Sequence, residues 1–246
     1  MEWVDDGIVL SCRSHGETGQ IVMAMTRHHG RHAGLVRGVR RGHALQPGTT
    51  GQMRWRARLA EHLGSLTIDV LETPAASVLH DADRLAALAS ACALVESAVP
   101  ERAPYPHVYD GFAALLGFLD QPIWDGVYVG WELQLLAALG FGLDLTRCAA
   151  TGANDDLAYV SPRTGRAVTL SAGEPYRDKL LALPGFLIGR GDATADAVAD
   201  GLALTGHFLD RLLFGQGHRA TPQARALLLD RCRRRAAAVR SPVAAD

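Results

Sequence analysis

Lysine is almost absent from this chain: Lys179 is the only lysine among 25 basic residues, and the others are arginines. This bias is compatible with codon usage as well as with a functional need. The sequence also lacks any apolar run of the ~18 residues that a membrane span needs. The acidic start, residues 1–6, has no apolar signal-peptide core. We therefore expect a cytoplasmic protein that does not contact a membrane.

Paired cysteines and catalytic motifs are also missing. The four cysteines are scattered without a CxxC pair, which argues against a disulfide framework and predicts reduced thiols. The chain has no Walker loop, no GxSxG and no HExxH. His28 and His32 have an HxxxH spacing, but at a strand end and not on a helix, so we expect no metal there. The sequence predicts neither enzymatic activity nor a cofactor.

Acidic residues are missing from one long stretch. Residues 18–60 carry eight arginines and no acid, for a net charge of +8. Residues 61–210 carry −12 and residues 211–246 carry +6, although the whole chain is at −1. Charge is therefore segregated along the chain, and the basic first part suits a polyanionic partner.

Five short β-rich runs separated by turn-forming residues precede Pro74. They cover residues 7–14, 20–27, 33–39, 52–59 and 66–71. Five strands in about 75 residues favour a small barrel, with an OB-fold as the leading candidate. We assign residues 1–77 to a DNA-binding OB-fold domain.

Helical periodicity replaces the strand pattern after Pro74. Helices are predicted at residues 81–99, 105–119, 122–139, 195–213 and 221–238. They define a helical domain at 78–246, interrupted by a turn-rich insert at 144–175 that we predict to be a short hairpin or knuckle. The predicted fold is therefore α+β, an N-terminal five-stranded barrel followed by an all-helical domain.

The strongest functional signal is arginine in the predicted barrel. In residues 52–59, Arg54, Arg56 and Arg58 alternate with apolar residues, which places them on one face of a strand. Such a face can follow a phosphodiester backbone with little regard to sequence, although a solvated basic face is the plainer alternative. The candidate DNA-binding residues are Arg27, Arg31, Arg37, Arg40, Arg41, Arg54 and Arg56.

Base stacking has less support in the sequence. Trp55 falls on the apolar side of the alternation, which favours core packing, and the histidines at 28, 29, 32 and 43 are weaker stacking candidates. We therefore expect electrostatic attraction to outweigh stacking.

A second basic patch lies near the C-terminus. It comprises Arg225, Arg231, Arg234 and Arg235 in the last predicted helix. These residues either only complement the helix dipole or form a second phosphate contact or a pocket for an acidic peptide tail.

Several short segments, taken in order, carry a resemblance to a known family. They are residues 5–10 with 16–17, 30–42, 131–136 with 140, 143–145 with 148, 159–162 with 165, 180–184 with 186–187, and 204–209. Together they span nearly the whole chain and resemble the RecO family of bacterial recombination mediators.

The resemblance implies an OB-fold, a helical domain and a zinc-knuckle-like insert. It also implies a non-enzymatic, nucleoid-associated protein that binds single- and double-stranded DNA, anneals strands and helps to load the recombinase RecA. The implied protein partners are RecR and the acidic C-terminal tail of single-stranded-DNA-binding protein. Some family members hold zinc with four cysteines, whereas here only Cys148 fits that pattern, so we expect a metal-free insert. The alternative function is an adaptor whose helical domain binds acidic tails without direct contact to DNA.

Overall fold

The computed structural model describes residues 1–38, 44–59, 62–215 and 220–240. The chain divides into two compact units. The first comprises residues 1–121 with 222–225, and the second comprises residues 122–221 with 226–246. The predicted division into 1–77 and 78–246 stays a prediction.

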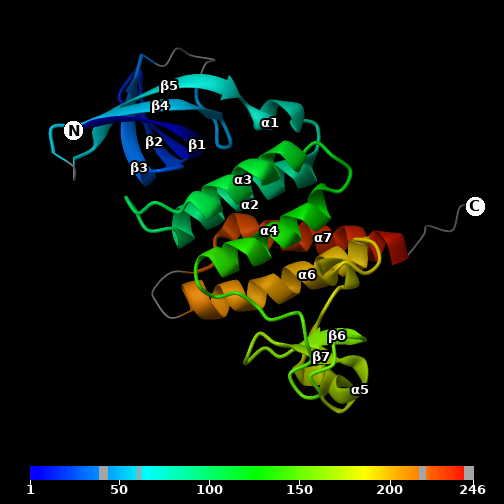
Figure 1. The fold of residues 1–246 in the computed structure, drawn as a ribbon. Coiled ribbons are helices and arrows are strands. Elements are labelled where there is room, and N and C mark those ends of the chain that lie inside the picture. Colours follow the sequence, from blue (N-terminus) through cyan, green and yellow to red (C-terminus); the bar gives the residue numbers. More distant parts are fainter. Residues whose placement is uncertain (39–43, 60–61, 216–219, 241–246) are drawn as a thin grey trace, which may run out of the picture. The chain divides into compact units, whose positions relative to one another are not determined.

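The first unit begins with a closed five-stranded barrel (Figure 1). Its strands are β1 (Glu2–His15), β2 (Gly19–Thr26), β3 (Gly30–Arg37), β4 (Thr50–Arg56) and β5 (Gly64–Glu72). They are ordered β1-β2-β3-β5-β4, and β4 pairs back onto β1. Only the β3–β5 pairing is parallel among these five contacts. This is the topology of an OB-fold, so the fold prediction is confirmed.

The long strand β1 closes the barrel because it pairs with two strands, β2 and β4. Its first half pairs with β4 and its second half pairs with β2. The register with β2 shifts between Val9 and Ser11. A bulge of this kind bends a strand and increases its twist, which allows one strand to turn the corner of a barrel.

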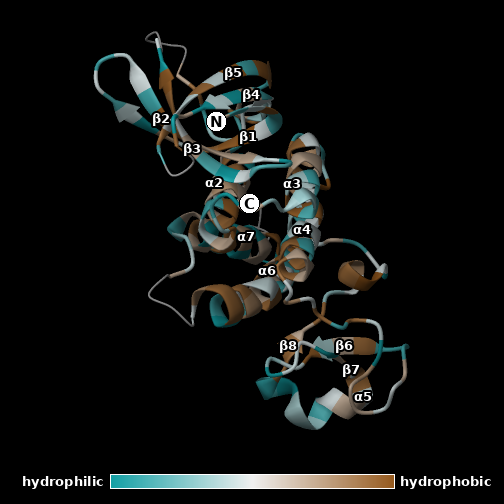
Figure 2. Ribbon diagram, turned by 60° about the vertical axis from the view of Figure 1, so that its left-hand side comes forward, coloured by the Kyte–Doolittle hydropathy of each residue, from teal (hydrophilic) through white to brown (hydrophobic). Residues whose placement is uncertain are grey.

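Buried and exposed residues alternate along β4, and Figure 2 shows hydrophobic and hydrophilic stretches along the strands of the barrel. The buried cluster contains Val9, Val22, Ala24, Met53, Trp55 and Leu66. The Trp55 indole donates to the Ala33 carbonyl at 3.0 Å, which satisfies its buried N–H. Gly64 makes room for this ring, because a Cβ there would lie 2.3 Å from Trp55. The predicted core position of Trp55 is therefore confirmed.

Three helices follow the barrel in the first unit: α1 (Pro74–Ser77), α2 (Ala82–Ala98) and α3 (Pro106–Phe118). Asp81 caps α2 by accepting from the backbone amides of Asp83 and Arg84. Helix α2 packs on β1 and β2, and Ser11 donates to Glu96 on this helix at 3.0 Å. The helix thus fixes the half of β1 that pairs with β2.

The second unit contains the helices α4 (Trp124–Ala138), α6 (Ala195–Phe208) and most of α7 (Gln223–Arg240), with the π-helical turn η3 (Leu209–Phe214) after α6. Helices α4 and α6 pack together. At their contact Thr205 donates to the carboxylate of Glu132, and both residues are fully buried. A buried carboxylate needs such donors, because its desolvation is otherwise costly.

The insert between α4 and α6 is larger than predicted. Its elements are β6 (Leu157–Val160), β7 (Ala167–Thr169), α5 (Leu170–Gly173), the 3-10 turns η1 (Glu174–Lys179) and η2 (Gly185–Ile188), and β8 (Leu181–Ala182). The sheet has three strands in the order β7-β6-β8. The two-residue strand β8 lies beyond position 175, and its pattern is too short for periodicity to reveal.

In the described part of the chain, no helix combines the length and apolar character needed to cross a bilayer.

Candidate nucleic-acid interface

Strand β4 displays arginines outward from the barrel. Arg54 and Arg56 are exposed, whereas Met53 and Trp55 between them are buried. In the register of β1 and β4, Glu2 lies opposite Arg56 and Val4 opposite Arg54. The Arg54 guanidinium approaches Glu2 at 3.7 Å, but both side chains are about half exposed or more. An exposed pair of this kind is weak, so a phosphate can compete for the arginine.

Two further arginines of the barrel segment are exposed. Arg37 is the last residue of β3, and Arg58 follows β4 by two residues. Gly38, which follows Arg37, has a φ of +73°, so the chain turns sharply where a side chain would be disfavoured. The predicted DNA-binding residues Arg40 and Arg41 lie outside the described residues.

Arg27 is exposed but already has an anionic partner. It follows β2 and contacts the carboxylate of Asp110 with two nitrogens, at 3.0 and 3.2 Å. This two-point geometry is the one in which arginine also recognises phosphate. Arg27 can therefore bind DNA only in competition with Asp110.

Arg31 occupies a different environment from the other predicted DNA-binding residues. It is 9% exposed, and its Nε donates to the Val99 carbonyl at 2.9 Å. Its Nη1 lies 3.3 Å from Glu101. The Arg102 amide also donates to the Arg31 carbonyl at 2.9 Å. Residues 99–102 therefore lie against the beginning of β3. Arg31 thus stabilises the first unit, and its guanidinium is not presented to solvent.

The structure does not bring the C-terminal arginines into one uniform patch. Arg225 is buried and belongs to the first unit, whereas the other three belong to the second. Arg235 pairs with Asp125 and lies 5.6 Å over the Trp124 ring. Arg234 is exposed, and its Nε donates to the Asp230 carbonyl at 3.3 Å. Arg231 is partly exposed. Only Arg234 therefore has an exposed side chain among the four.

A ring cluster that the sequence prediction missed lies on the inner side of the β1–β4 pair. Trp3 lies directly opposite Trp55, and their rings stack at 5.7 Å with an interplanar angle of 12°. His29, in the turn between β2 and β3, stacks on Trp3 at 4.5 Å and 8°. His32 meets both tryptophans edge-on. No single histidine or tryptophan indicates the cluster in the sequence, because it depends on the pairing of β1 with β4.

Asp5 fixes the two histidines of the turn. Its carboxylate accepts from the backbone amides of His28 and His29 at 2.7 and 3.1 Å, and from both Nδ1 atoms at 2.9 Å. Burial alone would raise the pKa of Asp5, but the hydrogen bonds from the two histidines outweigh it and hold the pKa below its ordinary value. The carboxylate is therefore ionised at neutral pH and holds the turn in place.

The rings surround a cavity of about 260 Å³. Its lining residues are Met1, Trp3, His28, His29, His32, Trp55, Arg102 and Pro104. His32 is 9% exposed, and its Nδ1 has no hydrogen-bond partner among the described residues. Burial lowers the pKa of His32, and the nearby Arg102 lowers it further. The His32 ring is therefore neutral at neutral pH.

Within residues 1–38, 44–59, 62–215 and 220–240, no group of three or more His, Cys, Asp or Glu residues is arranged to hold a metal ion. His28 and His29 instead direct their Nδ1 atoms to the same carboxylate.

The knuckle cysteine sits among hydroxyl groups. The Cys148 sulfur accepts from the Thr169 amide at 3.3 Å and lies 3.6 Å from the Thr169 hydroxyl. Burial alone would raise its pKa, but hydrogen bonds from Thr151 and Thr169 outweigh it and lower the pKa to about 6. Zinc in such a knuckle requires four Cys or His ligands. The donors around Cys148 do not fit a zinc ion.

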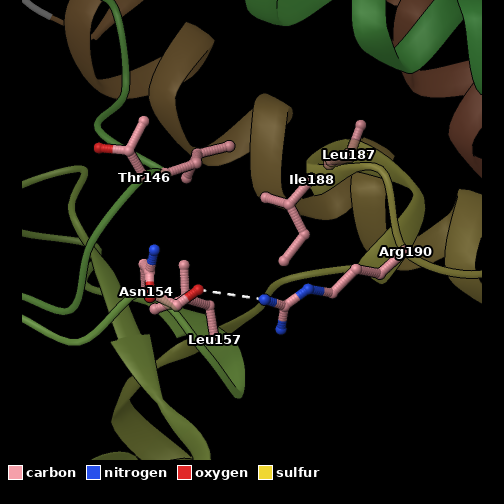
Figure 3. Close-up of a pocket in the computed structure, with 7 residues that line it drawn as sticks. Thr146, Asn154, Leu157, Leu187, Ile188 and Arg190 are labelled. Atoms are coloured by element: carbon pink, nitrogen blue, oxygen red, sulfur yellow. Dashed lines mark hydrogen bonds between the residues drawn. The ribbon is translucent and has the colours of Figure 1, made fainter.

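A cavity of about 390 Å³ opens in the second unit (Figure 3). Leu157, Leu187 and Ile188 form apolar parts of its lining, and Thr146, Asn154 and Arg190 add polar groups. Arg190 donates to the Asn154 carbonyl at 3.1 Å across this cavity. A cation beside apolar side chains suits an anionic peptide with an apolar residue.

Comparison with known proteins places both parts of the chain in one family. Residues 1–73 match the model described as "Recombination protein O N terminal", and residues 79–222 match "Recombination protein O C terminal". A protein named "DNA repair protein RecO" from Rhodospirillum centenum is 56% identical over 95% of this chain and 96% of its own length. Proteins of the same name from Rhodospirillum rubrum and Phenylobacterium zucineum are 51% and 50% identical, covering 98% and 94% of this chain and 100% and 97% of their own lengths. The chain therefore belongs to the RecO family.

Proposed function

We propose that this protein acts in DNA repair as a non-enzymatic recombination mediator that binds single- and double-stranded DNA through its barrel. The observation that carries this proposal is the outward row Arg54 and Arg56 on β4, with Arg37 and Arg58 also exposed. Arginines on the wall of a small barrel bind phosphates without reading bases, as an annealing protein requires. Arg31 is not part of this proposed surface, because its guanidinium is held by Val99 and Glu101.

Strand annealing follows from the same charges. Two DNA strands repel each other through their phosphates, and arginines that contact both strands reduce this repulsion. We propose that the protein anneals complementary strands in this way and helps to load the recombinase onto DNA coated by single-stranded-DNA-binding protein. Its proposed location is the cytoplasm, in association with the nucleoid.

The proposed protein partners are RecR and the acidic tail of single-stranded-DNA-binding protein. The cavity with Arg190 supports the second partner, because it combines a cation with Leu157, Leu187 and Ile188. Arg190→Glu should abolish binding of an acidic, apolar-ended tail peptide in a fluorescence-anisotropy titration. The exposed Arg163→Glu is the charge-matched control in the same unit, and equal losses in both variants would argue against this cavity.

The test of DNA binding is a salt series. If about five phosphates are neutralised, log affinity for a single-stranded oligonucleotide should fall with log salt at a slope of roughly −3 to −4. The double variant Arg54→Glu/Arg56→Glu should make this slope shallower by about 1.4, because each lost phosphate contact removes about 0.7. Arg163→Glu/Arg177→Glu changes the net charge equally on exposed residues of the second unit and serves as control.

The adaptor alternative predicts a different result. A protein that binds only acidic tails would show no affinity for bare oligonucleotide at any salt concentration. A slope near zero, or equal losses in the β4 variant and its control, would refute the role of the barrel arginines.

A further inference from the structure

We propose that the cavity bounded by Trp3, His28 and His29 is a subsite for a nucleobase of single-stranded DNA. This inference rests on the proposed DNA binding by the barrel and adds a second kind of contact to it. The barrel arginines recognise the phosphates, and the ring cavity takes an unpaired base from the same strand.

The rings form a continuous stack from the core to the surface. Trp55 is 2% exposed, Trp3 is partly exposed, and the His29 side chain is 36% exposed at the outer end. The His28 side chain beside it is 64% exposed. A flat base placed against this stack makes the same ring-to-ring contact that its members already make. Such stacking is tolerant of sequence because every base has a π-face.

Fixed backbone segments bound the cavity on two sides. Asp5 anchors both histidines of the β2–β3 turn through four hydrogen bonds. On the opposite side, Arg102 has a φ of +61°, a conformation that residues other than glycine seldom adopt. Its amide is bound to the Arg31 carbonyl, which fixes this conformation. Strained positions of this kind concentrate at binding sites.

Charge complementarity selects a nucleic acid as the occupant. Arg102 lines the cavity, and Arg54 and Arg56 flank Trp55 in β4. The Asp5 carboxylate, which accepts from both histidines of the turn, is 4% exposed. Glu101, whose charge acts on His32, is paired with Arg31 at 3.3 Å and stands next to Arg102. Arg102 is the cation of the cavity itself, whereas Arg54 and Arg56 lie on the opposite, outer face of β4. A base in the cavity can therefore have its own phosphate bound by Arg102 and neighbouring phosphates of the strand bound by the β4 arginines. A base within a duplex is stacked and paired, so the cavity favours single strands.

The experiment compares two single-stranded probes of equal length, oligo-dT and the same backbone made of abasic sites. Both carry the same phosphates, but only the first carries bases. We expect wild-type protein to bind oligo-dT about 5- to 150-fold more tightly than the abasic probe, the range that stacking of one base supports. Fluorescence anisotropy at one fixed salt concentration measures both affinities.

Variants then locate the contact. Trp3→Ala and His29→Ala should each lower affinity for oligo-dT and leave the abasic probe unchanged, so the preference disappears. Trp3→Phe should retain most of it. Val4→Ala is the matched control, because Val4 is the next residue in β1 and is 45% exposed. His29→Ala, whose ring is partly exposed, keeps the test decisive if Trp3→Ala fails to fold by circular dichroism.

The outcomes separate this inference from the proposed function. If wild-type protein binds both probes equally, or if Trp3→Ala and His29→Ala retain the preference, the base subsite is refuted while DNA binding stands. If neither probe binds, the proposed function fails and the subsite fails with it. Arg54→Glu/Arg56→Glu should weaken both probes by the same factor; a loss confined to oligo-dT would overturn the assignment of the arginines to phosphate.

Discussion

Replacement of Asp5 tests the physical basis of the ring cluster. Its side chain is 4% exposed. One carboxylate oxygen accepts from the Asp6 amide at 2.9 Å and from His28 Nδ1, and the other accepts from two backbone amides and from His29 Nδ1. An aspartate accepts five bonds here and donates none. A replacement without two acceptor oxygens therefore leaves some of these part-buried donors without their protein partner.

Asp5→Asn and Asp5→Ala should lower the free energy of unfolding by different amounts. Asp5→Asn retains one acceptor oxygen, which can face the two backbone amides of the turn, while its NH₂ group then opposes the Asp6 amide. We expect a loss of about 1–2 kcal/mol in the free energy of unfolding. Asp5→Ala removes every acceptor and should lose about 2–3 kcal/mol, because water replaces only part of the bonds to the partly exposed His28 and His29.

Urea unfolding followed by circular dichroism measures these losses, and Asp6→Asn on the exposed neighbour is the control. The lowered pKa of Asp5 adds a pH signature. A group with a lowered folded pKa stabilises above its unfolded pKa, and this contribution is lost as pH falls through the folded value. Wild-type stability should therefore drop below about pH 4, and Asp5→Ala should reduce that drop. Equal stabilities of Asp5→Ala and Asp6→Asn would refute the reasoning.

Three further predictions concern single residues. Cys148→Ala should remove the thiolate absorbance that titrates near pH 6 in the ultraviolet. Cys92→Ala should leave this titration unchanged, because burial raises the pKa of the Cys92 thiol to about 12. An unchanged titration in Cys148→Ala would contradict the hydrogen-bonded thiolate. Arg31→Ala should lower the free energy of unfolding by about 1–3 kcal/mol, because it leaves the Val99 carbonyl unpaired. Arg56→Ala should change it by less than about 0.5 kcal/mol while weakening DNA binding, and the opposite order would show that the two roles are reversed.

The elements of the barrel could be predicted because their signal is local. Alternation in β4 assigns Arg54 and Arg56 to one side and Met53 and Trp55 to the other, and the structure agrees. The period of a strand is two residues, so neighbours in sequence suffice to predict which side chains share a face. The same reasoning gives the correct face for residues 52–56, the part of β4 that the predicted strand covers, without any knowledge of its partners.

The fate of Arg31 could not be predicted in this way. Arg31 and Arg37 lie six residues apart in β3 and share its outer face, since His32 and Gly34 approach Trp55 on the inner side. Only Arg31 is buried, because residues 99–102 return to cover the start of the strand. That contact joins positions 68 residues apart, and no local pattern indicates it.

The ring cluster failed to appear in the sequence for a related reason. Trp3 lies more than 50 positions before Trp55, and His29 enters from a turn between two other strands. Each ring taken singly has the ordinary properties of a core or turn residue. The cluster depends on the register of β1 with β4. The sequence predicts a barrel but does not predict which residues of its strands lie opposite each other.

That register also links the two proposed kinds of DNA contact. Residues opposite each other in an antiparallel pair share a face. The pair Trp3 and Trp55 points into the barrel. The neighbouring pairs, Glu2 with Arg56 and Val4 with Arg54, therefore point outward. A slip of one residue between β1 and β4 would break the stack of Trp3 on Trp55. Insertion of one residue into β1 between Trp3 and Asp5 should therefore abolish the base preference while leaving Arg54 and Arg56 exposed on β4. The phosphate contribution, read from the abasic probe, should survive that insertion as long as the barrel folds.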